Sequence, residues 1–143
     1  MSRIQVLLVE DDPGDTLMIR EALEAHAPET SVSNVGDGVD AMRYLRRQGE
    51  FAASPRPDLV LLDLNMPRKD GREVLAEVKG DSDLCTIPVV VLTTSNSAQD
   101  IRRSYQLHAN AYITKPTDFD AFSSVVGAIG RFFGRVVQLP GTA

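Results

Sequence analysis

Three short runs of the chain are entirely apolar, and each stops abruptly at polar residues. They lie in the segments QVLLVEDD, PDLVLLD and PVVVLTT. A strand without polar residues at alternate positions has no solvated face, so it is buried on both sides. Such strands are typical of parallel sheets that helices cover on both faces.

Helix-forming segments alternate with these runs. Helices are expected at residues 13–26, 38–49, 71–80, 97–108 and 118–133, and two weaker strands at 30–35 and 111–114. Five strand–helix units in series imply right-handed crossovers. The sequence therefore predicts an α/β fold: a three-layer α/β/α arrangement around a five-stranded parallel sheet.

The size and charge of the chain limit the kinds of protein that it can be. The 143 residues fit one domain, which we expect to span residues 1–135, with a short tail at 136–143 and no output domain. A net charge of −5 argues against a nucleic-acid partner, which would need a basic face. The single cysteine, Cys85, excludes an internal disulfide. The N-terminus lacks the form of a signal peptide, and no apolar run is long enough for a membrane helix, so we expect a cytoplasmic protein.

Polar side chains follow the strands at the edge where the strands end. Glu10 and Asp11 follow the first strand, Asp63 the third, Thr93 the fourth and Lys115 the fifth. The carboxyl ends of parallel strands meet at one edge, where α/β proteins bind ligands. Asp12, directly before the first helix, is expected to be its N-cap instead.

This set of groups suits the transfer of a phosphoryl group. Clustered carboxylates repel one another unless a cation compensates them, and oxygen ligands with room for water suit Mg²⁺. Lys115 adds a fixed positive charge, and Thr93 offers a hydroxyl donor. Asp63 is then the nucleophile, which would form an acyl phosphate.

The same residues carry a family resemblance. The segments LLVEDD, LLDLNMPRKDG, VVVLTT and AYITKP resemble the motifs of receiver domains of two-component response regulators. The segments LRRQGEF and LHANAYITKP are similar to the corresponding segments of small stand-alone regulators paired with bacterial phytochrome histidine kinases. The resemblance implies the flavodoxin-like, doubly wound topology and a sensor histidine kinase as phosphoryl donor to Asp63.

It also implies roles for single residues. Asp11 would bind Mg²⁺ directly, Glu10 would help through water, and Asn65 would offer its backbone carbonyl. A cis peptide bond before Pro116 would aim Lys115. Thr93 and Tyr112 would form a switch, in which the hydroxyl moves toward the phosphoryl group and the aromatic ring follows inward. Catalysis is limited in this family to self-assisted phosphorylation and slow hydrolysis of the product.

Two other functions compete with this interpretation. Haloacid-dehalogenase-like phosphatases also begin with a strand-end aspartate, but they have a second acid two residues later, where this chain has Asn65. A flavodoxin-like ligand binder would need a phosphate-cradling loop after the first strand, where this chain has three acids. Asp63 considered alone could simply cap the next segment.

The last predicted helix carries two apolar stripes. One stripe is expected to cover the sheet and consists of Phe119, Phe122, Val126, Ile129 and Phe133. The second stripe consists of Val125, Ala128, Phe132 and Val136, and the sheet does not need it. We therefore expect a homodimer through Val125, Phe132 and Val136. The alternative is a tail that folds back over its own domain.

Overall fold

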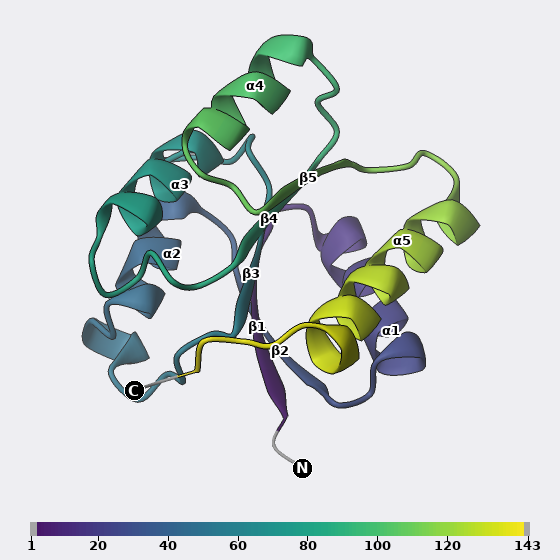
Figure 1. Cartoon of the computed structure of the whole chain (residues 1–143), viewed down its shortest axis with the longest axis horizontal. Coiled ribbons are helices and arrows are strands. Elements are labelled where there is room, and N and C mark those ends of the chain that lie inside the picture. Colours follow the sequence, from purple (N-terminus) through teal and green to yellow (C-terminus); the bar gives the residue numbers. More distant parts are fainter. Residues whose placement is uncertain (1–2, 142–143) are drawn as a thin grey trace.

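The computed structural model describes residues 3–141, which form five strands alternating with five helices (Figure 1). The elements in order are β1 (Ile4–Val9), α1 (Pro13–His26), β2 (Thr30–Val35), α2 (Gly38–Leu45), β3 (Leu59–Leu62), α3 (Gly71–Gly80), β4 (Val89–Thr93), α4 (Ala98–Gln106), β5 (Ala111–Thr114) and α5 (Phe119–Arg131). A 3₁₀ turn at Gly49–Phe51 follows α2, and a π-helical turn at Phe132–Val136 follows α5.

The strands form one parallel sheet in the order β2-β1-β3-β4-β5. Helices α1 and α5 cover one face, and α2, α3 and α4 cover the other (Figure 1). Alternate residues of β1 enter separate cores: Leu7 and Val9 pack toward α2 and α3, whereas Val6 and Leu8 pack toward α1 and α5. The predicted three-layer α/β/α fold with its doubly wound topology is confirmed.

Helix starts follow local sequence signals. Each of the five helices begins after an Asp or Ser side chain that accepts a hydrogen bond from a backbone N–H of the first turn. These groups satisfy donors that a helix cannot satisfy internally. Asp12 is such a cap, as expected, with Pro13 in the first turn of α1.

Several predictions about the helices were wrong. α4 ends at Gln106 and not at residue 108, and α5 ends at Arg131 and not at residue 133, where the π-helical turn follows. α2 ends at Leu45 and not at Gly49, because Arg47 adopts a left-handed conformation with φ of 54°. The N–H of Gln48 then bonds the carbonyl of Arg43, and the N–H of Arg47 bonds that of Tyr44, which closes the helix in a Schellman motif. Phe119, expected to cover the sheet, is 57% exposed at the start of α5.

Most of the other apolar positions of α5 divide as the stripes predict, but Val125 of the second stripe packs partly against the same core as the first stripe. Phe122, Val126 and Ile129 are buried against the sheet, and Phe133 packs partly against the same core. Phe132 and Val136 are 48% and 66% exposed, and Val125 is half-buried. Within residues 3–141, no helix is both long and apolar enough to span a bilayer.

Candidate functional site

Sheet register brings the strand-end residues together. Val9 of β1 pairs with Leu62 of β3, so the next residues, Glu10 and Asp63, leave the sheet side by side. The backbone N–H of Asp63 bonds the carbonyl of Val9 at 3.0 Å. On the far side of β4, the N–H of Lys115 bonds the carbonyl of Thr93 at 2.7 Å. The strands therefore deliver both charged groups to one edge.

A close contact between helix and loop supports Asp63 from behind. Gly71, the first residue of α3, donates its N–H to the carbonyl of Leu64 at 2.8 Å. A Cβ atom at Gly71 would lie 2.2 Å from the carbonyl oxygen of Asp63. Only glycine lets α3 begin this close to the loop, which explains the Asp-Gly pair in LLDLNMPRKDG.

Three carboxylates form the centre of the site. Glu10, Asp11 and Asp63 each place one oxygen within 4.8 Å of the others. Glu10 is buried, Asp63 is 8% exposed, and Asp11 lies open to solvent. Three converging carboxylates with one open side fit a divalent cation that keeps some of its water.

Lys115 neutralises this cluster from the other side. Its Nζ donates to Glu10 Oε1 at 2.5 Å and to Asp15 Oδ2 at 2.7 Å, and it lies 3.5 Å from Asp63 Oδ2. Burial would lower the pKa of Lys115, but the hydrogen bonds to Asp15 and Glu10 outweigh burial and raise that pKa above its ordinary value. Lys115 is therefore a permanent cation.

Glu10 is the most deeply buried of the acids. Burial raises the pKa of its carboxyl to about 7, although the hydrogen bond and charge of Lys115 act in the opposite direction. Its second oxygen accepts the backbone N–H of Asp12 at 3.1 Å. Both oxygens of Glu10 thus have partners, so this side chain joins the lysine to the acid cluster.

The proposed hydroxyl and aromatic groups lie on adjacent strands. Thr93 is fully buried at the end of β4, and no residue among those described is hydrogen-bonded to its Oγ1. Tyr112 on β5 is partly buried, and its hydroxyl donates to the carbonyl of Ser95 at 2.8 Å. The unpaired hydroxyl of Thr93 has a free donor for a group bound at this edge.

The peptide bond before Pro116 is trans, since none of the peptide bonds between described residues is cis. The expected cis bond is therefore wrong. Trans is the lower-energy form of an X–Pro bond by about 0.5–1 kcal/mol. Lys115 reaches its three carboxylates from the trans backbone.

Asn65 lies beside Asp63 on the loop after β3. Its side chain is exposed, and its N–H lies 3.3 Å from Asp63 Oδ1 as a donor. This contact keeps one carboxylate oxygen of Asp63 turned toward the loop backbone.

The sequence did not point to Asp15 or to the Asp100 cluster. Asp15, in the first turn of α1, reads as an acid that favours a helix N-terminus, yet it contacts Lys115. Asp100 of α4 accepts hydrogen bonds from Ser95 at 2.6 Å and from Arg72 of α3 at 2.8 Å. An acid three residues after a capping residue was the available signal in both helices, and it is common without function.

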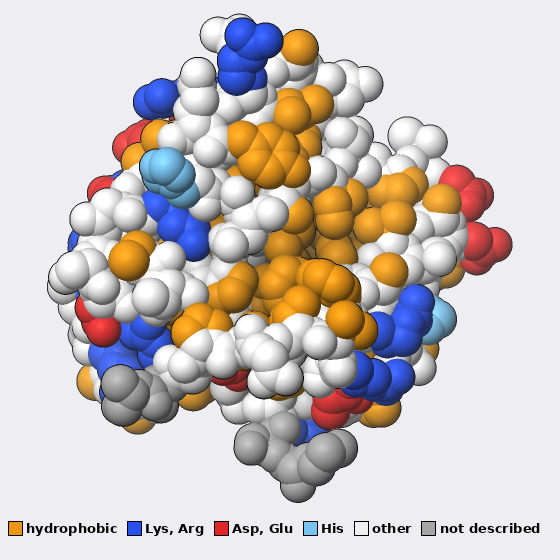
Figure 2. All heavy atoms as spheres, in the orientation of Figure 1, with side chains coloured by type: hydrophobic (Ala, Val, Ile, Leu, Met, Phe, Trp, Pro, Cys, Tyr) orange, Lys and Arg blue, Asp and Glu red, His pale blue; other side chains and the backbone are white. Residues whose placement is uncertain are grey.

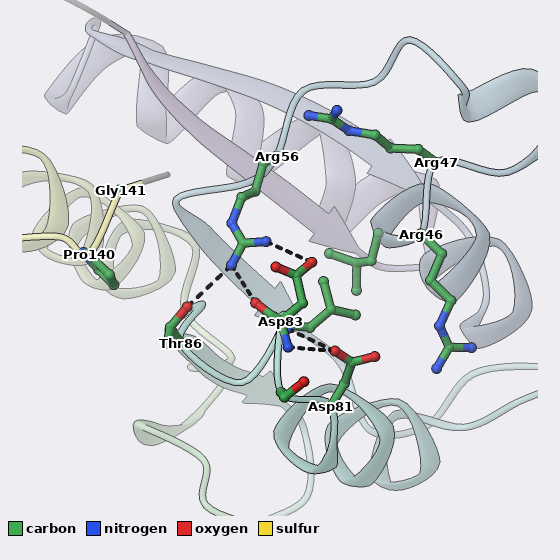
Figure 3. Close-up of a pocket in the computed structure, with 11 residues that line it drawn as sticks. Arg46, Arg47, Arg56, Asp81, Asp83, Thr86, Pro140 and Gly141 are labelled. Carbon is green, nitrogen blue, oxygen red and sulfur yellow. Dashed lines mark hydrogen bonds and ion pairs between the residues drawn. The ribbon is translucent and has the colours of Figure 1, made fainter. Parts of the chain in front are cut away.

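A cleft of about 770 Å³ lies at the other edge of the sheet (Figure 3). Figure 3 shows Arg56 of this cleft turned toward Asp83 and Thr86. Arg56 bonds the backbone carbonyl of Asp83 at 2.7 Å and the Thr86 hydroxyl at 3.2 Å. The carboxylate of Asp83, 3.3 Å from Arg56, neutralises its positive charge. Pro140 and Gly141 of the tail also line this cleft, so the tail lies over its own domain.

Comparison with known protein families assigns the chain. The model of the response regulator receiver domain matches residues 6–126. The chain belongs to this family. The phosphatase and flavodoxin-like alternatives are therefore wrong.

Individual relatives of this receiver domain are close and of similar length. Response regulator Rcp1 of a Synechocystis species is 47% identical over 135 residues, which cover 94% of this chain and 92% of Rcp1. The crystal structure of the phosphorylated cyanobacterial phytochrome response regulator RcpA has a TM-score of 0.94 at 48% identity, with 98% of this chain and 100% of that chain covered. The Mn²⁺-bound structure of Rcp1 has a TM-score of 0.92 at 46% identity, with coverage of 96% and 99%.

These findings fix the general chemistry of the receiver domain. Receiver domains are phosphorylated by histidine kinases and bind a divalent metal ion. The cluster of Glu10, Asp11 and Asp63 fits that requirement.

Proposed function

We propose that Asp63 is the phosphoacceptor of this receiver domain and takes its phosphoryl group from a phosphohistidine of a sensor histidine kinase. The observation that carries the proposal is the convergence of Asp63 with two further carboxylates and with Lys115 Nζ at 3.5 Å. A carboxylate oxygen of Asp63 forms the new O–P bond as the P–N bond breaks. The electron pair of that bond passes to the imidazole nitrogen, which then takes a proton from solvent.

The surrounding groups stabilise charge on the transferred group. Lys115, permanently charged, neutralises one phosphoryl oxygen, and the Thr93 hydroxyl donates to another. A bound divalent cation supplies the remaining positive charge. We assign its ligands to Asp11, Asp63, the backbone carbonyl of Asn65 and, through water, Glu10.

We propose Mg²⁺ as the physiological cation. Few protein ligands and one solvent-exposed carboxylate, that of Asp11, favour an ion that keeps several waters. The Mn²⁺ in the structure of Rcp1 supports a divalent-cation site in that relative.

Thr93 and Tyr112 are the proposed switch. Phosphorylation would draw the Thr93 hydroxyl toward the new oxygens and favour a conformer in which Tyr112 moves inward. The partial burial of Tyr112 and its bond to the β4–α4 loop at Ser95 support such a coupling.

A bacterial phytochrome is the proposed kinase partner. The support is the 47% identity to Rcp1 and the 48% identity to RcpA, a phytochrome response regulator. The single cysteine supports a reducing, cytoplasmic location for this encounter.

We also propose that the receiver domain spans residues 1–135 and forms homodimers. Residues 136–143 are its short tail, of which 142 and 143, like 1 and 2, lie outside the described residues. The proposed dimer interface comprises Val125, Phe132 and Val136. Figure 2 supports it, since hydrophobic side chains gather over α5 and its C-terminal turn and extend toward β5 and α4.

Intact mass after incubation with acetyl phosphate and Mg²⁺ tests the phosphoacceptor. We expect a gain of about one phosphate, lost in Asp63→Asn and prevented by chelation of the metal. Asp58→Asn is the matched control, because Asp58 precedes β3 at the other edge of the sheet and bonds the N–H of Gln5. An adduct that persists in Asp63→Asn would refute the assignment.

A further inference from the structure

Asp15 contacts Lys115 more closely than the phosphoacceptor does. Lys115 Nζ lies 2.7 Å from Asp15 Oδ2 and 3.5 Å from Asp63 Oδ2. Asp15 is in the first turn of α1, a hundred positions from the lysine in sequence. The ammonium is therefore held by an acid that is outside the carboxylate cluster.

The ammonium has no donor to spare for a new ligand. A lysine ammonium has three N–H donors, and Glu10, Asp15 and Asp63 take one each. A phosphoryl oxygen on Asp63 can take over the longest of these contacts, the one of 3.5 Å to Asp63 itself. The ammonium can move close to that oxygen only if one of its two short contacts, with Glu10 or with Asp15, lengthens.

Burial decides which contact opens at the lowest cost. The Glu10 side chain is 2% exposed, so a Glu10 carboxylate without its lysine would stay in a poorly solvated site. The Asp15 side chain is 23% exposed, and water can replace the lysine there. The contact between Lys115 and Asp15 is therefore the one that opens at the lower cost.

We propose that Asp15 is a positioning residue, which holds the Lys115 ammonium in the unphosphorylated protein and yields it to the phosphoryl group on Asp63. This role rests on the proposed function of Asp63. It makes Asp15 a competitor of the phosphoryl group, so the contact lowers the affinity of the site for that group. It also links the occupancy of Asp63 to the first turn of α1.

Beryllofluoride, a tetrahedral mimic of a phosphoryl group on a carboxylate, is the probe. With Mg²⁺ present, we expect Asp15→Asn to lower the half-saturating beryllofluoride concentration about fivefold, as loss of a modest coupling between two sites would. Asp15→Glu, which keeps the carboxylate, should stay within about twofold of wild type. ¹⁹F NMR measures all three proteins at equilibrium, independent of hydrolysis.

Asp12→Asn is the matched control. It removes the same charge from the same end of α1, and asparagine still caps the helix. If Asp12→Asn and Asp15→Asn lowered the half-saturating beryllofluoride concentration equally, the charge at the end of the helix would explain the effect. That result would overturn the proposal. Weaker binding by Asp15→Asn would also overturn it, because Asp15 would then support the bound state.

A crystal structure with beryllofluoride gives a second measurement that needs no variant. The Lys115 Nζ to Asp15 Oδ2 distance should open from 2.7 Å to beyond hydrogen-bond range. A distance that stays near its present value with Lys115 also bound to the mimic would overturn the role. If wild type binds no beryllofluoride at all, the phosphoacceptor assignment itself fails, and the role of Asp15 fails with it.

Discussion

At the single-residue scale, the Thr93 hydroxyl is buried without a hydrogen-bond partner among residues 3–141, a state that it shares with the Ser104 hydroxyl. An unpaired buried hydroxyl costs about 1–3 kcal/mol of stability by mutational measures. The protein tolerates this cost at the position where the proposed function needs a donor for the phosphoryl group. The proposed function, and not stability, would explain the threonine.

Thr93→Val should therefore stabilise the unphosphorylated protein. We expect the free energy of unfolding to rise by about 1 kcal/mol, because valine has a similar shape and no polar group to bury. Urea denaturation measures the change. Thr30→Val is the control. The Thr30 hydroxyl donates to the carbonyl of Ala27 at 2.8 Å, so its removal should destabilise the protein. Destabilisation by both substitutions would contradict the explanation.

At the scale of elements, the most extensive contact between two α-helices of the described chain lies between α1 and α5, where two glycines of α5 take the place of larger residues. A Cβ atom at Gly127 would lie 2.6–2.8 Å from ring and Cβ atoms of His26. At Gly130 it would lie 2.7 Å from Leu23 and 2.8 Å from Ala27. These glycines let the two helices pack side by side on one face of the sheet (Figure 1).

Gly127→Ala should lower stability although alanine is the better helix former. We expect a net loss of about 1–2 kcal/mol, because the cost of overpacking exceeds the gain in helix propensity of about 1 kcal/mol. The free energy of unfolding in urea measures it. Gly80→Ala is the control: it lies in the last turn of α3, where a Cβ would meet nothing within 4 Å, and it should be neutral or stabilising. A stabilised Gly127→Ala would show that the helices have room to separate.

At the scale of the whole molecule, the two edges of the sheet have different roles. The carboxyl edge holds the acids and Lys115, whereas the other edge holds the Arg56 cleft and the end of the tail. The tail lies over its own domain, so the proposed dimer surface is limited to the exposed side of α5 and its final turn. Phe132 is central to it, with its ring packed edge-on against Phe133.

Phe132→Asp should abolish the proposed homodimer. A charge within an apolar interface is costly to bury, so sedimentation should give the mass of one chain for the variant and of two chains for wild type. Leu17→Asp, at a similarly exposed leucine of α1, should leave the dimer intact. The same sedimentation for wild type and Phe132→Asp would rule out this interface.

The local elements could be predicted from the sequence because their signals are local. Four predicted elements have unchanged bounds, at residues 13–26, 30–35, 71–80 and 111–114. The spacing of their apolar residues and, for the two helices, the capping side chains determine them. The site could also be proposed from the sequence, because parallel strands must end at a common edge. It comprises Glu10, Asp11, Asp63, Thr93 and Lys115. The order of the strands came from the family resemblance and not from the pattern itself.

Contacts between distant segments were decided by the tertiary structure alone. The left-handed turn at Arg47 replaced the expected end at Gly49, and Phe119 faces solvent although it continues an apolar stripe. The contact of Asp15 with Lys115 depends on how α1 packs beside the sheet, and the turn that carries Asp15 has no signal for it. A residue's own neighbours in sequence determine its backbone, but its partners a hundred positions away depend on how whole elements pack.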